Sequence, residues 1–333
     1  MKPQGALIGP HLQAFFSEHL CNHKRASPQT IASCRDTFRL LLQFLKKATG
    51  IEPAAMKIAD INAPAVLAFL DSLEQQRGNS VRSRNIRLAA IRSFFRLIAL
   101  RDPGSVGIAT RVLAIPAKRE DKKLVGYLTR EEIDAILAVP DRTQWSGRRD
   151  HALLLTMYNS GARVSEMTAL QRTQVHFGPS TFLQLHGKGR KERTVPLWPH
   201  TSRVLQAWFH ELDGKSGSVA FPNARGRALT RYGVTYLLKE AATAAAVSQP
   251  GLRRRRVTPH LVRHSTAMHL LQSGVDIAVI ALWLGHESIE TTHVYVEADL
   301  ATKERALAKL TPAEGTIPRF RPADSVLAFL DSL

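Results

Sequence analysis

Six side chains between residues 163 and 295 combine positive charge, acid–base capacity and one nucleophilic oxygen. They are Arg163, Lys188, His260, Arg263, His286 and Tyr295. A guanidinium group binds a phosphate through paired hydrogen bonds, and an imidazole exchanges a proton near neutral pH. A tyrosine hydroxyl can attack phosphorus and form a covalent ester. Together these residue types predict phosphoryl-transfer chemistry on a phosphodiester.

Arg163 is predicted at the start of a helix. In the stretch NSGARVSEM it follows Gly161, a glycine typical of a helix end. Free backbone N–H groups at a helix N-terminus, with a guanidinium beside them, suit a bound phosphate. The structural alternative is an ion pair between Arg163 and Glu166, three residues later.

His260 and Arg263 lie in the first turn of another predicted helix, in TPHLVRHSTAMHLLQSG. Thr258 is its predicted N-cap, and a proline takes the first helical position. Residues three apart share a helix face, so the imidazole and the guanidinium should emerge together. We expect His264 and His269 to face elsewhere, with His264 a packing residue.

Lys188 is predicted at the tip of a β-hairpin. The segment TFLQLHGKGRKERTVPL (181–197) alternates apolar residues around a glycine–lysine turn. The flanking glycines allow a tight turn that projects the lysine side chain. The alternative is an ordinary exposed tip, and Lys191 and Arg193 are close enough to be confused with Lys188.

His286 and Tyr295 close the set in LWLGHESIETTHVY (282–295). A glycine turn precedes the histidine, and Ser288 can cap the helix that carries the tyrosine. Taken alone, Tyr295 would be a half-buried ring with a hydrated hydroxyl.

Five histidines lie between residues 260 and 293, which raises the possibility of a metal site. His260 and His264 have no carboxylate or cysteine at a recognised ligand spacing. The sequence also lacks the G-x-x-x-x-G-K-[ST] pattern of a nucleotide-binding loop. We therefore expect neither a metal nor a cofactor.

The overall composition predicts a polyanionic partner. The 333 residues include 46 Lys and Arg against 28 Asp and Glu, a formal charge of +18, and 44% are hydrophobic. This excess favours nucleic acid as the partner. No apolar run reaches the roughly 18 residues of a membrane span, and the N-terminus lacks a secretory signal. With only two cysteines, Cys21 and Cys34, we expect a cytoplasmic, nucleoid-associated protein.

The chain is predicted to divide into a helical domain (1–108), a basic linker (109–126), a second domain (127–312) and a C-terminal tether with a short helix (313–333). The fold class is mainly α, with one small β-sheet in the second domain. Thr129 and Glu132 form a predicted capping box where that domain opens.

The helix SVRSRNIRLAAIRSFFRLIAL is the predicted DNA-contacting helix of the first domain. Its apolar residues form one stripe, and its other face carries arginines and almost no acid. The alternative is a solvated face. The predicted DNA contacts, including the linker and the hairpin, are Arg82, Arg84, Asn85, Arg92, Arg96, Lys122, Lys123, Arg190 and Lys191.

The stretches GARVSE, GKGRKERTVPL, TPHLVRHSTA and LGHESIETTHVY resemble the tyrosine recombinase (phage integrase) family, and all six chemical positions carry the family's residue types. The resemblance is strong over about residues 127–300 and looser over residues 10–100. It implies an N-terminal SAM-like core-binding domain and a C-terminal mixed α/β catalytic domain that clamp double-stranded DNA. Helical structure starts near residue 10, so we expect a simple two-domain member without an arm-binding domain.

The resemblance implies site-specific recombination through a covalent 3′-phosphotyrosine, without ATP or metal, in an integrase, transposon or plasmid enzyme. Arg163 and Arg263 would clamp the phosphate, His286 would donate a hydrogen bond to it, and Tyr295 would attack. His260 is the candidate base. The resemblance assigns the leaving-group proton to Lys188.

Three other functions remain open at this stage. A type IB topoisomerase uses the same chemistry without exchange between two sites. A catalytically silent DNA-binding regulator would not need all six residues. A membrane-surface protein fits less well, because the arginines do not accompany a strongly apolar face.

The octapeptide VLAFLDSL occurs at residues 66–73 and again at 326–333. In the second copy Val326, Leu327, Phe329, Leu330 and Leu333 require a partner surface if they are to be buried. The alternatives are docking on the same chain and docking on a neighbouring protomer of a dimer to tetramer on DNA. The family resemblance favours the neighbour.

Overall fold

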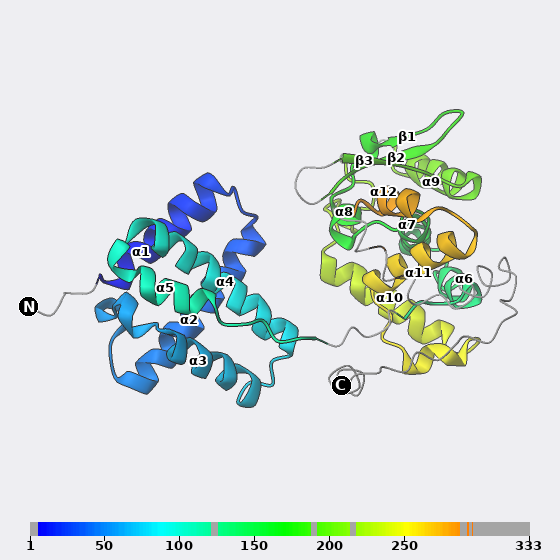
Figure 1. The fold of residues 1–333 in the computed structure, drawn as a ribbon. Helices are drawn as coiled ribbons and strands as arrows, with labels where there is room; N and C mark the ends of the chain where they lie inside the picture. The colour runs from blue at the N-terminus through cyan, green and yellow to red at the C-terminus, as the bar shows by residue number, and fades with distance from the viewer. Residues whose placement is uncertain are drawn as a thin grey trace, which may run out of the picture. The chain divides into compact units, whose positions relative to one another are not determined.

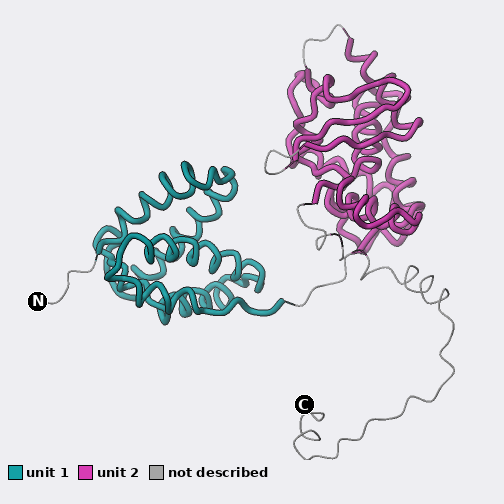
Figure 2. Tube along the Cα trace, turned by 45° about the horizontal axis from the view of Figure 1, so that its top comes forward, with its two compact units in different colours: residues 1–122 teal, residues 123–333 magenta. Residues whose placement is uncertain are grey.

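The computed structural model describes residues 6–120, 126–187, 192–213 and 218–286, together with positions 292 and 295. The chain forms two compact units, Met1–Lys122 and Lys123–Leu333 (Figure 2). Each unit has its own hydrophobic core, and the two are described separately below.

The elements of the first unit are all helices over its described residues, apart from one isolated antiparallel bridge between Leu7 and Lys57 (Figure 1). It comprises α1 (Ile8–Ala14), a π-helical segment (Phe15–His23), α2 (Pro28–Thr49), α3 (Ala63–Gln75), α4 (Val81–Arg101) and α5 (Val106–Leu113), with short 3-10 turns at Pro53–Ala55, Ile58–Asp60 and Pro103–Ser105. Phe15, Phe38 and Phe94 pack edge to face at the centre, an arrangement that aromatic rings favour. The apolar stripe of α4 is buried in this core, as its spacing predicts.

The predicted linker begins later than residue 109, because α5 continues to Leu113. Ala109 and Val112 are fully buried in the first core, and the first unit extends to Lys122. A short amphipathic helix, α5, therefore occupies the start of the predicted linker.

The second unit combines helices with one small sheet. Its elements are α6 (Arg130–Ala138), α7 (Trp145–Ser160), α8 (Val164–Ala169), β1 (Val175–His176), β2 (Phe182–His186), β3 (Glu192–Pro196), α9 (Pro199–Glu211), α10 (Arg231–Ala245), α11 (Pro259–Gln272) and α12 (Ile277–Leu284), with 3-10 turns at Arg172–Gln174 and Pro250–Arg254. Nearly all of α7 is buried, and it packs against α6, α9 and α11.

The sheet has the order β1-β2-β3 and is antiparallel throughout. The hairpin that the alternating residues predict is β2–β3, with Leu183 opposite Val195 and Leu185 opposite Arg193. Leu183, Leu185 and Val195 face the core, because alternate residues of a strand point to the same side. The hairpin tip, with Lys188, Arg190 and Lys191, lies outside the described residues, as do Lys122 and Lys123.

Capping residues determine where the helices around the site begin and end. Thr129 and Glu132 form the predicted capping box, at 3.2 Å and 2.9 Å. Gly161 ends α7 in the left-handed conformation, and Thr258 caps α11. The predicted fold class, mainly α with a small sheet, is confirmed. None of the described helices is both long and apolar enough to cross a lipid bilayer.

Candidate active site

Arg163 is the N-cap of α8, one residue after the α7–α8 corner. Its backbone N–H and its Nη1 both donate to Glu166, at 2.8 Å and 3.0 Å, and its Nη2 donates to the carbonyl of Gly285 at 3.3 Å. The structural alternative, an ion pair with Glu166, is therefore present. It uses only one edge of the guanidinium, whose side chain is 30% exposed.

Arg263 lies beneath this corner and is only 2% exposed. Its Nη1 donates to the carbonyl of Gly161 and its Nη2 to that of Leu284, each at 2.7 Å. These carbonyls end α7 and α12, where helix dipoles favour a cation. Burial, followed by the nearby charges of Arg163 and Arg193, lowers the pKa of Arg263 to about 10, so it stays charged at neutral pH.

Arg193, on β3, is a third guanidinium in this cluster. It donates to both carboxylate oxygens of Glu166, at 2.9 Å and 2.7 Å, and through Nε to the carbonyl of Trp283 at 2.9 Å. Sequence analysis had noted Arg193 only as a neighbour of Lys188. Its position opposite the buried Leu185 was a signal that its side chain follows the inner face of the sheet.

Tyr295 is 2% exposed, and its hydroxyl faces α11. His264 Nδ1 lies 2.7 Å from Tyr295 Oη, and the His286 ring stacks on the phenol ring with centroids 6.4 Å apart. Burial raises the pKa of Tyr295 to about 12, although the charge of Arg263 acts in the opposite direction. The tyrosine is therefore a neutral phenol beside an arginine cluster.

The expectation that His264 faces away from the site is wrong. It lies four positions after His260, so both imidazoles emerge on the same face of α11, with ring centroids 5.4 Å apart. That spacing was visible in the sequence. His269 does face elsewhere, since its Nδ1 lies 2.7 Å from Tyr158 Oη.

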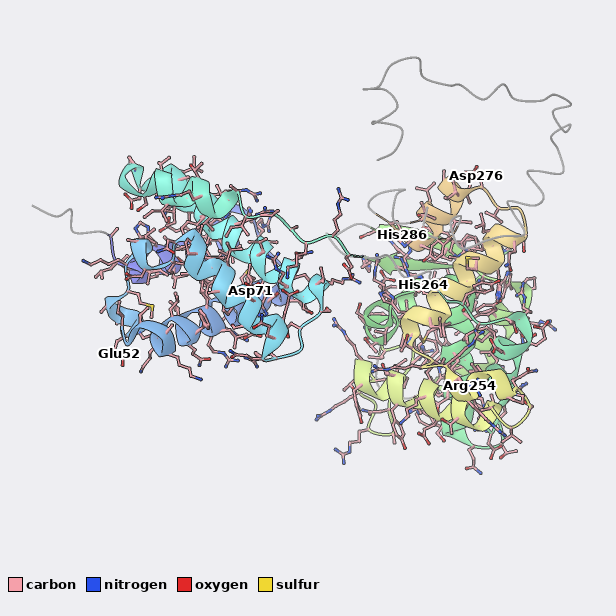
Figure 3. The ribbon with its side chains drawn as sticks, turned by 60° about the horizontal axis from the view of Figure 1, so that its bottom comes forward. Glu52, Asp71, Arg254, His264, Asp276 and His286 are labelled. Atoms are coloured by element: carbon pink, nitrogen blue, oxygen red, sulfur yellow. The ribbon has the colours of Figure 1, made fainter. Side chains whose placement is uncertain are left out.

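Both histidines next to Tyr295 are neutral at neutral pH. Burial, followed by nearby positive charges, lowers the pKa of His264 and that of His286 to about 4. His286 Nδ1 lies 2.8 Å from Thr292 Oγ1. Figure 3 shows His264 and His286 in the same part of the second unit. Among the site residues that the structure describes, permanent positive charge therefore comes from the arginines.

Five of the six predicted catalytic residues fall on described positions. The structure gathers Arg163, Arg263, His286 and Tyr295 around the ends of α7 and α12, and places the exposed His260 beside the half-buried His264 on α11. Their catalytic roles stay predictions, as does the role of Lys188, which lies outside the described residues.

Comparison with known proteins decides the family. Residues 126–301 match the phage integrase family, and residues 13–101 match the phage integrase N-terminal SAM-like domain. The chain belongs to the phage integrase family. It is a tyrosine recombinase, an enzyme of site-specific DNA recombination.

Relatives of this recombinase cover almost its whole length. It is 51% identical over 328 residues to the putative integrase/recombinase y4rC of Sinorhizobium fredii, covering 98% of this chain and 99% of that protein. It is 33% identical to the tyrosine recombinase XerC of Oceanobacillus iheyensis, covering 89% and 94% of the two chains.

Solved structures share the fold. The Tn1549 transposon integrase in complex with circular intermediate DNA has a TM-score of 0.70 at 15% identity, with 92% of this chain and 100% of that chain covered. The XerH recombinase bound to palindromic difH substrate has a TM-score of 0.67 at 21% identity, with 91% and 94% covered.

The predicted DNA-contact residues of α4 divide into two sets in the recombinase. Arg82 and Arg96 are exposed, whereas Arg84 is 2% exposed. Arg84 donates to the carbonyl of Pro116, and Arg92 donates to that of Ile115. Arg84 and Arg92 therefore bind the segment that follows α5.

Asn85 completes this intramolecular contact. Its side-chain amide donates to the carbonyl of Lys118 at 2.9 Å, and its Oδ1 accepts from the Lys118 backbone N–H at 3.1 Å. We call the contacts of Arg84, Asn85 and Arg92 with residues 115–118 the exit clasp. The DNA contacts of all nine predicted residues stay predictions.

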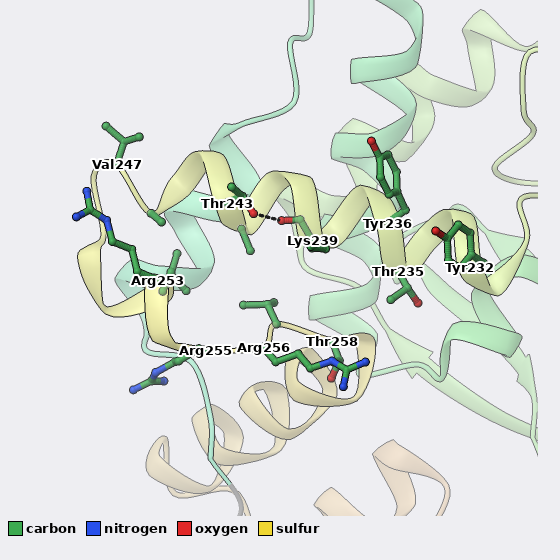
Figure 4. A pocket seen from close by; sticks show the side chains of 14 residues that line it. Tyr232, Thr235, Tyr236, Lys239, Thr243, Val247, Arg253, Arg255, Arg256 and Thr258 are labelled. Atoms are coloured by element: carbon green, nitrogen blue, oxygen red, sulfur yellow. Dashed lines mark hydrogen bonds between the residues drawn. The ribbon is translucent and has the colours of Figure 1, made fainter.

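A basic hollow lies beside the N-terminus of α11, and sequence analysis did not single it out. It has a volume of about 880 Å³ between α10 and the segment that enters α11. Figure 4 shows Lys239, Arg253, Arg255 and Arg256 around it, ending at Thr258, the N-cap of α11. Four consecutive arginines at 253–256 were the available signal.

Within the described residues, no group of three His, Cys, Asp or Glu side chains is arranged to hold a metal ion.

Proposed function

We propose that Tyr295 is the nucleophile through which this recombinase cleaves and rejoins double-stranded DNA. The observation that carries the proposal is the location of Tyr295 Oη. It lies 2.7 Å from His264 Nδ1, its ring stacks on His286, and the charge of Arg263 acts on it, while no other tyrosine hydroxyl of the described residues contacts these groups.

Attack by the phenol on a DNA phosphorus exchanges one ester for another of similar stability. The 3′-phosphotyrosine keeps the free energy of the broken bond, so a new 5′-hydroxyl can rejoin the strand without ATP. Arg163 and Arg263 neutralise charge on the transferring phosphoryl group. His286 donates a hydrogen bond to it, a histidine of α11 accepts the phenol proton, and Lys188 protonates the departing 5′-oxygen.

We further propose that specific double-stranded sites bind along two basic surfaces. In the first unit the exposed Arg82 and Arg96 of α4 contact phosphates, with Lys122 and Lys123 in the linker. In the second unit the basic hollow leads along arginines 253–256 to α11. Arg190 and Lys191 are proposed to contribute further phosphate contacts. We propose that the two units clamp the DNA. Because DNA is the partner, the protein is proposed to lie in the cytoplasmic nucleoid.

The enzyme is proposed to work as a dimer to tetramer, with residues 326–333 docked on a neighbouring protomer. Support comes from the identical octapeptide in α3. There Val66, Phe69, Leu70 and Leu73 are at most 2% exposed, whereas Leu67 is 39% exposed. As a helix, the C-terminal copy would present the same face, formed by Val326, Phe329, Leu330 and Leu333. A lambda integrase tetramer bound to a Holliday junction has the same fold.

The test uses a suicide DNA substrate made from the sequence flanking the gene. Wild-type protein should form a denaturation-resistant adduct that peptide mapping assigns to Tyr295. Tyr295→Phe should bind the DNA equally well and form none. An adduct that persists in this variant, or that maps to another residue, would overturn the assignment.

Two further measurements test the rest of the proposal. Arg163→Ala and Arg263→Ala should each slow adduct formation by orders of magnitude, and near-wild-type rates would place the phosphate clamp elsewhere. Relaxation of arbitrary supercoiled DNA, without a requirement for paired sites, would instead identify a topoisomerase.

A further inference from the structure

The group next to the Tyr295 hydroxyl is His264, not the residue that the sequence suggested as the base. The hydroxyl oxygen and His264 Nδ1 are 2.7 Å apart, a normal length for a strong hydrogen bond. The two ring centroids are 5.5 Å apart. His264 directly follows Arg263, so the same turn of α11 fixes the imidazole and the buried guanidinium.

His260 contacts the ring of His264, which in turn contacts the phenol. Its ring centroid lies 5.4 Å from that of His264, with the two rings inclined at 32°. His286 contacts the other side of the site, where it stacks on the phenol and binds Thr292 through Nδ1. Of these three imidazoles, His264 is the one that contacts the hydroxyl oxygen.

The direction of this hydrogen bond depends on the protonation states and on the imidazole tautomer. Burial, followed by the charges of His260 and Arg263, lowers the pKa of His264 to about 4. Burial raises the pKa of Tyr295 to about 12. A neutral imidazole therefore faces a protonated phenol. The tautomer that suits proton transfer has a bare Nδ1, to which the hydroxyl donates. The imidazole proton then resides on Nε2.

We propose that His264 Nδ1, rather than His260, accepts the hydroxyl proton of Tyr295 during its attack on the DNA phosphorus. The inference rests on the nucleophile proposed above. The Oη–H bond breaks as an N–H bond forms on Nδ1, and an Oη lone pair forms the bond to phosphorus. The bond from phosphorus to the 5′-oxygen breaks, and that oxygen takes a proton from a separate acid. Rejoining reverses each step.

Without DNA the transfer is strongly uphill, because phenol and imidazole both resist ionisation in this buried site. A bound phosphate changes this balance. Its negative charge beside α11 stabilises an imidazolium, and the cationic Arg263 stabilises the developing phenolate. Because the proton leaves as the bond to phosphorus forms, a free phenolate is not required.

A purely positioning role for His264 predicts a different outcome for one substitution. His264→Asn keeps a hydrogen-bond acceptor close to the place of Nδ1 but cannot take up a proton near neutral pH. His264→Ala removes both functions. If His264 only orients the phenol, the asparagine variant should retain activity that the alanine variant loses.

The chain provides a matched control on the same helix. His269 Nδ1 lies 2.7 Å from Tyr158 Oη, the same distance as in the His264–Tyr295 pair. His269→Asn therefore disturbs an equivalent buried contact that the proposed chemistry does not use. Its adduct formation should stay close to the wild-type rate, and its unfolding midpoint calibrates the structural cost of the exchange.

The experiment measures single-turnover adduct formation on the suicide substrate at saturating protein, with DNA affinity and the unfolding midpoint measured alongside. We expect His264→Asn and His264→Ala both to slow adduct formation by about 100-fold or more, with DNA affinity kept. His260→Asn should slow it less. A substrate whose leaving 5′-oxygen is replaced by sulfur needs no acid, and the His264→Asn defect should persist on it.

The outcomes separate cleanly. Near-wild-type adduct formation by His264→Asn, with His264→Ala impaired, would make His264 a positioning residue only. A larger defect in His260→Asn than in His264→Asn would return the base role to His260. In both cases the wild-type adduct at Tyr295 would stand, whereas a wild-type adduct at another residue would overturn the proposed nucleophile itself.

Discussion

Glu166 and Arg193 form a two-point ion pair that joins α8 to β3. Both carboxylate oxygens accept from the guanidinium, at 2.9 Å and 2.7 Å, and the two side chains are 4% and 9% exposed. Glu166 also accepts from Arg163. One carboxylate thus holds two guanidinium groups at fixed positions in a site where their mutual repulsion would otherwise be large.

Glu166→Gln should destabilise the second unit by about 3 kcal/mol, because it leaves buried guanidinium charge without its counter-charge. Adduct formation should also slow, since Arg163 loses its support. Urea unfolding measures the first effect, and Glu240→Gln, an exposed acid on α10, is the control. Equal unfolding free energies for both variants would show that the carboxylate does not stabilise the cluster.

Stability should fall as the pH drops from about 6.5 to about 4. His264 and His286 have folded-state pKa values near 4 against an ordinary value of 6.5. In this window the unfolded chain takes up protons that the folded chain refuses, so acid favours unfolding. Urea unfolding at pH 7 and pH 5 should show a smaller loss for His264→Asn than for wild type. An identical loss would mean that His264 titrates normally in the folded protein.

Asn85→Ala should weaken the exit clasp. Two hydrogen bonds to Lys118 are lost, which should cost about 1 kcal/mol and speed amide hydrogen exchange at Lys118. Arg82→Ala and Arg96→Ala are the contrast, because both side chains are exposed. They should lower DNA affinity and its salt dependence while leaving that exchange rate unchanged. Slow exchange at Lys118 in Asn85→Ala would argue against the clasp.

Gly161→Ala should destabilise the recombinase more than Gly274→Ala. Both glycines have positive φ, +58° and +85°, so both substitutions strain the backbone by roughly 1 kcal/mol. Only at Gly161 would the new Cβ also collide, at 2.6 Å, with Leu284 Cδ2. Unfolding free energies compare the two. A smaller effect at Gly161 would imply that the α7–α12 contact yields easily.

Phe329→Ala should weaken cooperative assembly on DNA, whereas Leu327→Ala should not. The basis is α3, where the residue equivalent to Phe329 is 1% exposed and that equivalent to Leu327 is 39% exposed. Gel-shift titration measures assembly, and cleavage of a single half-site should survive even deletion of residues 320–333. Equal assembly by wild type and the deletion protein would rule out docking on a neighbour.

Sequence patterns identified the features of this protein that depend on local chemistry. The Thr129 capping box, the Gly161 helix end and the β2–β3 hairpin each follow from a few neighbouring residues. Contacts between distant segments were missed. The clasp of Asn85 on Lys118 spans 33 positions, and Arg193 reaches Glu166 across 27. The contact of His264 with Tyr295 was missed for a different reason. The spacing of His264 from His260 already placed both imidazoles on one helix face.

Among the residues that the structure describes, the core of the first unit shares no side chain with the core clusters of the second unit. Mutations that reshape the surface of α4 therefore need not disturb the packing beneath Tyr295. On the proposed assignment of α4 to DNA contact, the surface that meets the target can change while the packing around the proposed nucleophile is kept. The same independence offers a practical route to retargeting, by transplanting the first unit between relatives.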